Sequence, residues 1–477
     1  MIMKVNKLFL SAFFISLTSV VVTAQTRGEI ATEFQGEGTE SDPYLISTAA
    51  ELRKLADDVE NRMTYRGEYF KLANDIVVNE NVLNGNGDLN EDLRNSFEQW
   101  KPIGTETTHF CGTFDGANHT IYGLYMYLEE EKYGGLMGYL SGTVKNLVIK
   151  DSYFGGNGRF GCVAAYAVKV TINGKDYNAY VSNCINYGRI ESLLGYCGGI
   201  CGTIRDCTIS KCANFGHITS TGNGVYKGIG GIVGNAGGLY DYQLGNSTII
   251  DCCNVGLVDG RSETGGIAGT LSGSESKICN SVNHSVINSV FAVGGISGHT
   301  IKCPTIDGCV NYGKIVSERE DNKGAIAGYF SVPYPTFLLN NAYLETSCDY
   351  FAFGDNQWES TETYWNRRLM MNNRVMTKRE MQQQSFLDEL NQNAVKLGAE
   401  YSKWKFGSDG FPTLEWVDEM ITAGIEQIAY NGKGTGGGQN CNIYNLSGQM
   451  VRANSTDTDN LPNGIYVISG KKVVVTK

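Results

Sequence analysis

The stretch Val293–Ile315, VGGISGHTIKCPTIDGCVNYGKI, holds two short patterns that recur along the chain at intervals of about 30 residues. The first is a glycine-rich pentad, Gly-Gly-aliphatic-variable-Gly, and the second is Cys-x-Asn-x-Gly. Because a fixed period indicates a repeat architecture, the chain is expected to form a solenoid. The pentad copies are Gly134–Gly138, Gly198–Gly202, Gly230–Gly234, Gly265–Gly269 and Gly294–Gly298, with degenerate copies at 161–164 and 324–328.

The pentad has a consistent column pattern: its middle residue is aliphatic or Cys, the next varies and the last is small. If the pentad is one extended strand, its middle and last residues share the core face and the variable residue points to solvent. Glycine is then needed where the chain turns and where a Cβ would collide with the neighbouring coil. The glycines assigned this structural role are Gly135, Gly199, Gly231, Gly266 and Gly295.

The second pattern places one Asn in each repeat, at Asn186, Asn214, Asn254 and Asn311, whereas Ser281–Ser285 departs from it. An Asn at the same place in every coil can donate its amide to the next Asn of the stack, and its turn tolerates left-handed backbone. Repeats rich in Val, Ile, Thr and Tyr, without helical periodicity, predict a mainly β chain that forms a right-handed parallel β-helix. One coil gains on the order of 6 to 12 kcal/mol from its inward aliphatic side chains, which its ordering entropy offsets, so only a stack is stable.

The composition, with 60 Gly and 7 Pro among 477 residues, favours an ordered β protein with many turns. A formal net charge of −11 argues against nucleic acid or anionic lipid as the main partner, because both bind basic surfaces. Residues 1–24 combine Lys4 and Lys7 with an apolar run from Leu8 to Val22, which predicts a secretory signal peptide. We expect no transmembrane span in the mature chain, because no other apolar run is long enough.

The 14 Cys of an exported chain raise the question of disulfides. Four of them form the Cys column of the repeat, so the favoured interpretation is a small apolar residue in the core, with bridges at Cys303 or Cys348 left open. Residues 197–212 hold four Cys at the spacing of zinc ligands, but strand alternation explains each of them, and no metal site is predicted. The sequence indicates no cofactor and leaves open whether calcium is needed.

Two helices are predicted at the ends of the solenoid. Thr48–Glu51 has the spacing of a capping box and is followed by an apolar helical face, which predicts a helix over the first coil. Thr377–Glu380 is a second capping box before another such face. The expected organisation is a signal peptide at 1–24, an N-terminal cap with the first coils at 25–130, repeats at 131–345, a C-terminal cap with one helix at 346–420, a linker at 421–440 and a β-sandwich-like tail at 441–477.

Residues 38–416 resemble the secreted and surface proteins that carry GLUG motifs. The resemblance rests on GT-x4-PYLI, W-x-PIG, GTFDG-x2-HTI-x-GL and the recurring GGI-x-G. It implies a β-helical surface protein of the adhesin type. Some members of this group are joined to peptidases, but this sequence has no His-Glu-x-x-His zinc motif, so that activity is not carried over.

The tail, with IYN-x2-GQ, LP-x-GIY and KKVVV, resembles the C-terminal sorting domains of type IX secretion in Gram-negative anaerobes. This resemblance implies recognition by the secretion machinery, export and retention at the outer-membrane surface. The alternative is a plain β-sandwich tail.

No catalytic constellation is recognised. Asp206, Asp251 and Asp307 stand at different offsets from nearby Cys residues, so a carboxylate pair is not predicted, and the five His share no triad or metal spacing. Trp358, Trp365 and Arg367 form a cluster that could bind a sugar or a partner, although packing against the last coil is favoured.

The leading functional hypothesis is binding to a glycan, a host surface or a matrix by a protein secreted or held at the surface of a Gram-negative bacterium. A stack of coils with variable outward residues suits many weak contacts. The alternatives are a carbohydrate-active enzyme, either a polysaccharide lyase or a glycosidase, and an architectural spacer.

Overall fold

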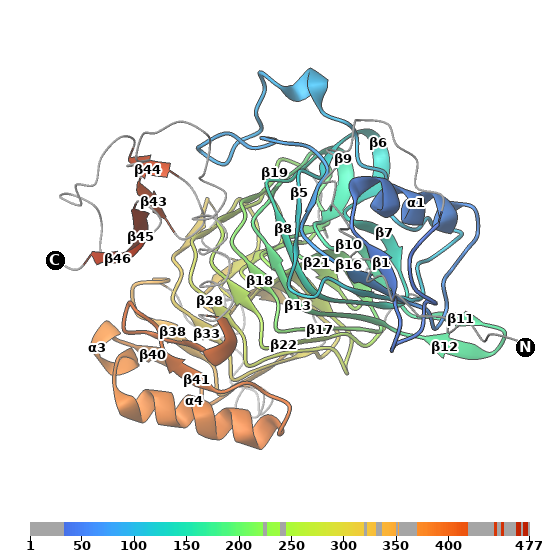
Figure 1. Cartoon of the computed structure of the whole chain (residues 1–477). Helices are drawn as coiled ribbons and strands as arrows, with labels where there is room; N and C mark the ends of the chain where they lie inside the picture. The colour runs from blue at the N-terminus through green and yellow to red at the C-terminus, as the bar shows by residue number, and fades with distance from the viewer. Residues whose placement is uncertain are drawn as a thin grey trace, which may run out of the picture.

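The computed structural model describes residues 33–222, 227–238, 245–318, 322–330, 336–349, 352 and 372–417, and the backbone of 370–371, 443–445, 450–452, 464–468 and 471–475. Within these ranges, three parallel sheets of 19, 12 and 7 strands surround one core, which confirms the parallel β-helix. The coils stack in chain order, from the blue and cyan end beside helix α1 (Ala49–Glu60) to the yellow end in Figure 1.

The strands of the three sheets fall into five rows that run along the stack, and a coil contributes at most one strand to each row. Rows 1 and 2 form the 19-stranded sheet and are joined by β8 (Thr143–Lys150) and β13 (Ala179–Asn186). The other strands of row 1 are β1 (Tyr44–Ile46), β2 (Tyr69–Leu72), β4 (Thr113–Asp115), β17 (Cys207–Ser210), β22 (Thr248–Ile250), β27 (Lys277–Cys279), β32 (Thr305–Asp307), β37 (Phe337–Leu339) and β39 (Met370–Met371). Those of row 2 are β3 (Ile76–Val77), β5 (Thr120–Tyr122), β18 (Ala213–Asn214), β23 (Cys253–Asn254), β28 (Val282–Asn283), β33 (Val310–Asn311), β38 (Ala342–Leu344) and β40 (Arg374–Met376).

Rows 3 and 4 form the 12-stranded sheet and are joined by β6 (Tyr125–Gly134) and β9 (Tyr153–Gly161). Row 3 continues with β14 (Arg189–Ser192), β19 (Ile218–Ser220), β24 (Val258–Asp259), β29 (Ile287–Ser289) and β34 (Ile315–Ser317). Row 4 holds β15 (Cys197–Gly198), β20 (Ile229–Gly230), β25 (Thr264–Gly265), β30 (Val293–Gly294) and β35 (Lys323–Gly324). Row 5, the 7-stranded sheet, holds β7 (Met137–Leu140), β10 (Ala164–Val168), β16 (Cys201–Arg205), β21 (Val233–Ala236), β26 (Ala268–Ser272), β31 (Ser297–Ile301) and β36 (Ala327–Phe330).

The core is built from columns of identical positions. In row 1, Ile209, Ile249, Ile278 and Ile306 lie in register on successive coils, and each is fully buried. Parallel register repeats the same environment at every coil, so each added coil extends one continuous apolar stripe.

The pentad is a corner between two sheets, so the prediction of one straight strand is wrong. In the copy Gly230–Gly234, β20 ends at the first glycine and β21 begins at Val233, with a bend between them. Ile232 and the variable Val233 are both fully buried in the core, so the variable residue does not point to solvent. A bend turns two consecutive side chains to the inside, which strict alternation within a strand does not allow.

Helix α1 forms as the capping box predicts. The Thr48 hydroxyl accepts from the backbone N–H of Glu51, whose carboxylate accepts in return from the N–H of Thr48. The apolar face of the helix, which packs into the main core, consists of Leu52, Leu55, Ala56 and Val59.

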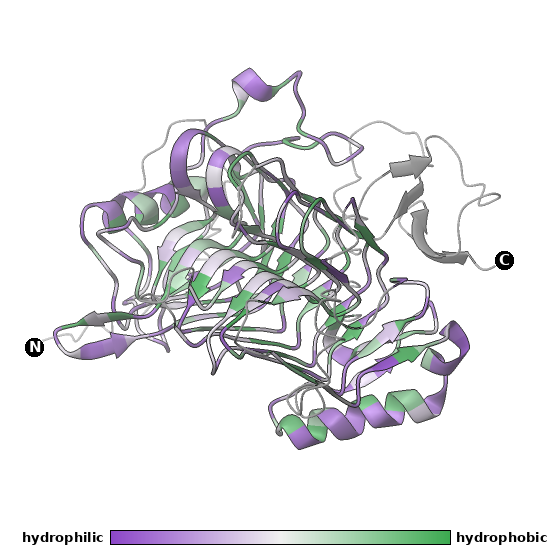
Figure 2. Cartoon of the chain, turned by 180° about the vertical axis from the view of Figure 1, so that it is seen from behind, coloured by the Kyte–Doolittle hydropathy of each residue, from purple (hydrophilic) through white to green (hydrophobic). Residues whose placement is uncertain are grey.

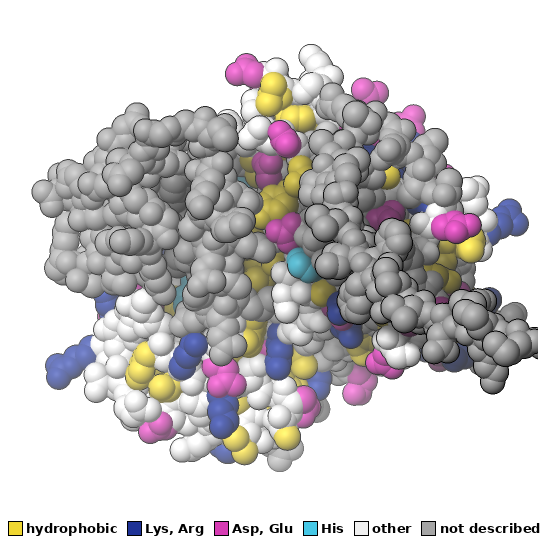
Figure 3. All heavy atoms as spheres, viewed as in Figure 1, with side chains coloured by type: hydrophobic (Ala, Val, Ile, Leu, Met, Phe, Trp, Pro, Cys, Tyr) yellow, Lys and Arg dark blue, Asp and Glu magenta, His cyan; other side chains and the backbone are white. Residues whose placement is uncertain are grey.

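Residues 377–417 pack against the flank of the stack. Within this range there are two helices, α3 (Lys378–Met381) and α4 (Gln384–Leu397), where a single helix was predicted after the capping box at Thr377. They are followed by the hairpin of β41 (Trp404–Phe406) and β42 (Pro412–Leu414). Figure 2 shows hydrophobic and hydrophilic residues alternating around α4, and acidic and basic side chains are interspersed on the described surface near it (Figure 3). Its apolar face packs against outward side chains of row 2 from several coils, among them Ala213, Cys253 and Val310.

Buried hydrogen bonds fix this segment in place. Ser402 donates its backbone N–H and its hydroxyl to the buried Asp251 carboxylate, at 2.9 and 2.8 Å. The Trp404 indole N–H donates to Asn280 Oδ1 at 2.6 Å. Because Asp251 and Asn280 belong to successive coils, the segment ties the repeats together laterally.

The remaining described elements are peripheral. The 3₁₀ turn η1 (Arg94–Ser96) lies in the 79–98 excursion, and β11 (Val170–Ile172) pairs with β12 (Lys175–Tyr177) in a hairpin. In the tail, the described residues form one antiparallel sheet of β43 (Ile443–Asn445), β44 (Met450–Arg452), β45 (Gly464–Ile468) and β46 (Lys471–Val475).

The cysteines lie mostly in the core. None of the thirteen described Cys forms a disulfide, and Cys303 alone among them is partly exposed. The bridges left open for Cys303 and Cys348 are therefore not formed, and the Cys column is buried, as its apolar interpretation predicts.

Candidate functional site

The Asn column forms an unbroken ladder inside the stack. The Nδ2 of each Asn donates to Oδ1 of the next at 2.8 to 2.9 Å, in the order Asn186, Asn214, Asn254, Asn283 and Asn311. Each Asn also bonds the backbone two residues on, and all five side chains are fully buried. The divergent copy Ser281–Ser285 keeps its place because it retains the Asn.

The two halves of the repeat meet across the coil. A Cβ on Gly231 would lie 2.2 Å from the carbonyl oxygen of Gly266 and 2.4 Å from Asn254 Oδ1. Gly199, Gly266 and Gly295 stand in the same relation to Asn214, Asn283 and Asn311, whereas Gly135 faces the carbonyl of Gly161. Glycine is thus required because the backbone corner is pressed against the amide ladder.

The left-handed backbone lies three residues before the ladder, and not at the ladder Asn as expected. Residues with positive φ on successive coils are Asn146, Asn183, Lys211, Asp251, Asn280, Gly308, Asn340 and Asn372. Asn and Gly tolerate this conformation, and Asn side chains of this column bond one another or a neighbouring Asp. The sequence signal for this column was the residue directly before the repeat Cys.

These columns hold the scaffold together and present no chemistry to solvent. The predicted cluster of Trp358, Trp365 and Arg367 lies outside the described residues. In the part of the chain that the structure describes, no group of three His, Cys, Asp or Glu could hold a metal ion.

The outer face of row 3 carries a connected set of polar side chains. Ile190, Ile218 and Val258 point into the core, so their sequence neighbours point outward. Strand register places one outward residue from each of four successive coils in a file, which we call the row 3 file: Glu191, Thr219, Asp259 and Asn288. All four are partly exposed.

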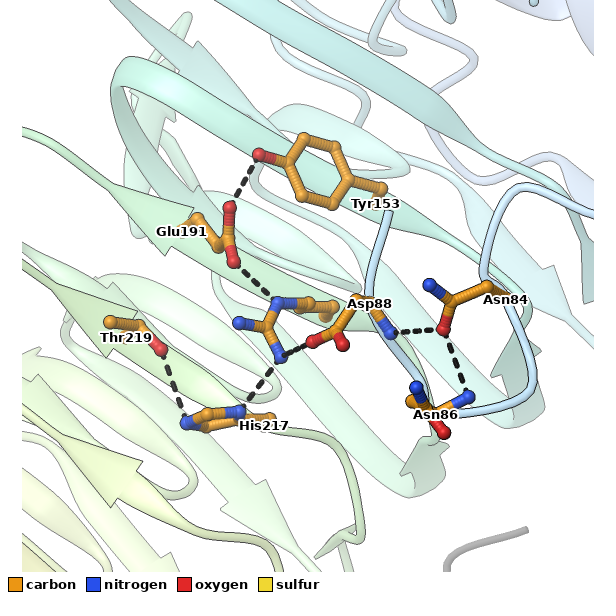
Figure 4. A network of polar contacts seen from close by, with 8 residues as sticks. Asn84, Asn86, Asp88, Tyr153, Glu191, His217 and Thr219 are labelled. Carbon is orange, nitrogen blue, oxygen red and sulfur yellow. Dashed lines mark hydrogen bonds and ion pairs between the residues drawn. The ribbon is translucent and has the colours of Figure 1, made fainter. Parts of the chain in front are cut away.

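A network centred on Arg189 organises one end of this file (Figure 4). The Arg189 guanidinium bonds Glu191 Oε1 at 2.5 Å, Asp88 Oδ1 at 3.0 Å and His217 Nδ1 at 2.9 Å. Tyr153 donates its hydroxyl to Glu191 Oε2 at 2.7 Å. Charge-assisted bonds of this kind hold both acidic groups in fixed positions.

Electrostatics keep His217 neutral within the network. Burial first, and then the positive charge of Arg189, lowers the pKa of His217. Because Arg189 N–H donates to Nδ1, the ring proton sits on Nε2, which lies 3.1 Å from the Thr219 hydroxyl. Burial and the bond to Glu191 raise the pKa of Tyr153, so its hydroxyl remains a donor.

Asp88 comes from the 79–98 excursion, a loop that leaves an early coil. Asp88 lies about a hundred residues before Arg189 in the sequence, so no local sequence pattern could predict that the two meet. A turn built on Asn84, whose Oδ1 accepts from the N–H groups of Asn86 and Asp88, shapes the excursion near its tip. Its base is held by Asp151, which accepts from the N–H groups of Val82 and Leu83. Burial raises the pKa of Asp151 to about 6, although these bonds oppose the rise.

Sequence reasoning did not find this site. Its residues come from four separate segments, and none of them belongs to the repeated columns. The outward residues of row 3 differ from coil to coil. This variability, within an otherwise regular repeat, was the signal in the sequence that could have indicated a binding surface.

The site can present fixed donors and acceptors but is poorly arranged for proton transfer. Both oxygens of Glu191 are occupied, and Asp88 is bound to Arg189 with its side chain 55% exposed. A general acid or base needs a free oxygen near the reacting group. Asp259, one coil beyond Thr219, is partly exposed on the same face.

Comparison with known proteins gives partial likenesses. No family model matches the chain. A stretch of 120 residues, 25% of the chain, is 34% identical to a "Putative Gly-rich membrane protein" of Evansella cellulosilytica, and 138 residues, 28% of the chain, are 30% identical to "Halomucin" of Haloquadratum walsbyi. These matches span 12% and 1% of the two relatives' own lengths.

Among solved structures, a "putative immunoglobulin A1 protease" from Bacteroides ovatus aligns over 80% of this chain and 94% of its own, with 19% identity and a TM-score of 0.49. No helix in the described residues is long and apolar enough to cross a bilayer. The chain is thus similar to short parts of two longer proteins, and its fold is a parallel β-helix.

Proposed function

We propose that this chain is a cell-surface or secreted β-helical protein that binds glycans along the row 3 file. The observation that carries the proposal is the regular file of partly exposed carboxylate, hydroxyl and amide groups, one from each of four successive coils, on a rigid sheet. Neighbouring coils lie about 4.8 Å apart, so an extended chain of sugars along the axis would meet a new polar group at each step.

The chemistry of the file fits a hydroxyl-rich ligand. Asp259 and Asn288 offer acceptors, Thr219 and Asn288 offer donors, and Arg189 is already neutralised by two carboxylates. Because the groups are held by strands and by the Arg189 network, little side-chain entropy is lost on binding. Many weak contacts along such a face add up to useful affinity.

The surface location rests on the predicted signal peptide, on the resemblance to GLUG-motif proteins and on the names of the two partial relatives. Attachment to a Gram-negative outer membrane through a type IX sorting tail is the corresponding proposal for residues 441–477. A chain ending before residue 441 should then appear in the medium, and equal retention of both forms on cells would contradict the role of the tail.

Binding is tested on an array of neutral and acidic polysaccharides with the full chain. We expect a double variant, Asp259→Ala with Asn288→Ala, to lose at least tenfold in affinity for the polysaccharide that the wild type retains. Thr208→Ala, on the outward face of row 1 and similarly half-exposed, is the matched control and should bind as the wild type does. Equal binding by the double variant would refute the assignment of this face.

A carbohydrate-active enzyme is the second candidate, because Asp88, Glu191 and Asp259 place three carboxylates on one face. Such an enzyme would release reducing sugars or unsaturated products from the retained polysaccharide, and Asp259→Asn would abolish the release. If the chain binds the polysaccharide and releases no product, the result supports a binding protein. If it neither binds nor releases product, the architectural spacer is the function that remains.

A further inference from the structure

The parallel stack has an open strand position at its N-terminal end. In row 1, the first coil contributes β1, which pairs with β2. In row 2 the first coil contributes no strand, because the chain turns after β1 and continues as α1 from Ala49. Row 2 therefore begins with β3, which pairs with β5 alone among the described strands.

The vacant position is a cavity of about 590 Å³. Its walls are the start of α1 at 47–50 with Arg53, the strand β3 with the residues that follow it, and residues 93–98 of the excursion. A volume of several hundred Å³ is typical of ligand sites and exceeds what a few ordered waters require.

The backbone of β3 is oriented to use this space. Val78 N–H donates to the carbonyl of Tyr122, so the groups at 76 and 78 face β5. Backbone groups alternate in direction along a strand, hence the N–H and C=O of Val77 point the other way, into the cavity. An edge of this kind is a ready template for another strand.

The side chains around the cavity select for a particular kind of strand. Val77 is 51% exposed and Leu93 is 39% exposed, which gives the cavity apolar patches. Three acidic residues, Asp75, Glu80 and Glu98, line the cavity together with one basic residue, Arg53, which is bound to Glu98 at 2.6 Å. The lining therefore carries an excess of negative charge, which complements a basic partner.

From these observations we propose that the β3 edge is a docking site for an extended peptide with apolar β-branched residues flanked by Lys or Arg. The peptide adds to row 2 as the strand that the first coil lacks, with main-chain hydrogen bonds to Val77 and a basic side chain near Glu80. This is recognition by strand addition, in which the backbone supplies affinity and the side-chain surroundings supply specificity. The proposal is independent of glycan binding by the row 3 file.

The test measures fluorescence anisotropy of labelled acetyl-Lys-Val-Thr-Val-Lys-amide with the full chain. We expect saturable binding that weakens as salt is raised. Val77→Pro removes the N–H that faces the cavity, while the bonds of 76 and 78 to β5 remain, so it should weaken binding at least tenfold. Glu80→Lys should weaken binding at least fivefold, whereas Glu275→Lys, the same charge change at an exposed position far along the chain, should not.

Two peptide controls keep the test decisive if Val77→Pro fails to fold. The peptide with Glu in place of both Lys, and the peptide methylated on alternate backbone nitrogens, should each fail to bind the wild-type chain. Binding of the methylated peptide as tightly as the parent would overturn the proposal. Concentration-dependent dimers of the chain alone that Val77→Pro abolishes would also overturn it, since the occupant would then be a second copy.

Discussion

The amide ladder makes a quantitative prediction at Asn254, which lies at its centre. The substitution Asn254→Ala removes three hydrogen bonds: to Asn283 at 2.8 Å, to the carbonyl of Gly256 at 3.0 Å and from Asn214 at 2.9 Å. A net contribution of about 1 kcal/mol for each bond gives about 3 kcal/mol. The space left in a fully buried position adds to this loss.

The neighbouring amides moderate the effect without removing it. Asn214 keeps its bond to the Gly216 carbonyl, and Asn283 still accepts from the N–H of Ser285. We therefore expect the free energy of unfolding to fall by about 3 to 4 kcal/mol, as measured by urea unfolding followed by circular dichroism. Asn254→Asp should cost at least as much, because a carboxylate cannot donate to Asn283 and would be buried.

The control is Asn95→Ala, which changes an exposed Asn in the 79–98 excursion and should alter stability by less than about 0.5 kcal/mol. If Asn254→Ala were as mild as this control, the ladder would add nothing to stability. The inference that amide stacking holds successive coils together would then be refuted.

Three further predictions follow from the same geometry. Gly231→Ala should lower the melting temperature by well over 10 °C or prevent folding, because the added Cβ would lie 2.2 Å from a carbonyl oxygen. The control Gly407→Ala, whose Cβ would have its nearest contact at 3.2 Å, should be tolerated. Equal melting temperatures of the two variants would contradict the close approach at Gly231. In a thiol titration of the native chain, Cys303 should react first among the thirteen described Cys, and the buried Cys should react only after denaturant is added. Rapid labelling of all of them in the native state would show that the Cys column of the repeat is not in the core. Burial raises the pKa of Asp151 from 3.8 to about 6. Between pH 3.8 and 6 the folded state therefore binds more protons than the unfolded state. The free energy of unfolding should fall by up to about 3 kcal/mol as the pH rises from about 4 to 6. Asp151→Asn should flatten that slope in urea titrations at each pH, and an unchanged slope would assign the dependence to another group.

The sequence by itself determined the architecture, because the scaffold depends on identities that recur in every coil. Each coil needs the same three features: a glycine in close contact with an amide, an Asn that donates to the Asn of the next coil, and an aliphatic residue in the core. Because they are needed in every coil, each leaves a periodic signal in the sequence. The two helix starts were also predictable, since a capping box such as Thr48–Glu51 is a local interaction.

Local reasoning failed where the chain bends or meets distant parts of itself. The pentad follows strand alternation until the corner at Gly231, where two consecutive side chains turn inward. Helix α4 could be predicted as amphipathic, but its place on the flank depends on the residues that follow it. Ser402 and Trp404 bond Asn280, which lies more than a hundred residues away in the sequence. Sequence periodicity predicts which face of an element is buried, but it does not predict which other element packs against that face.

The candidate sites were decided by tertiary structure alone. Asp88 and Arg189 meet because an excursion from an early coil folds across row 3, and the β3 edge is open because α1 replaces one strand of the first coil. Neither arrangement repeats, so neither could leave a period in the sequence. Repetition encodes the stack, and the exceptions to repetition, which only the folded chain brings together, create the surfaces available for binding.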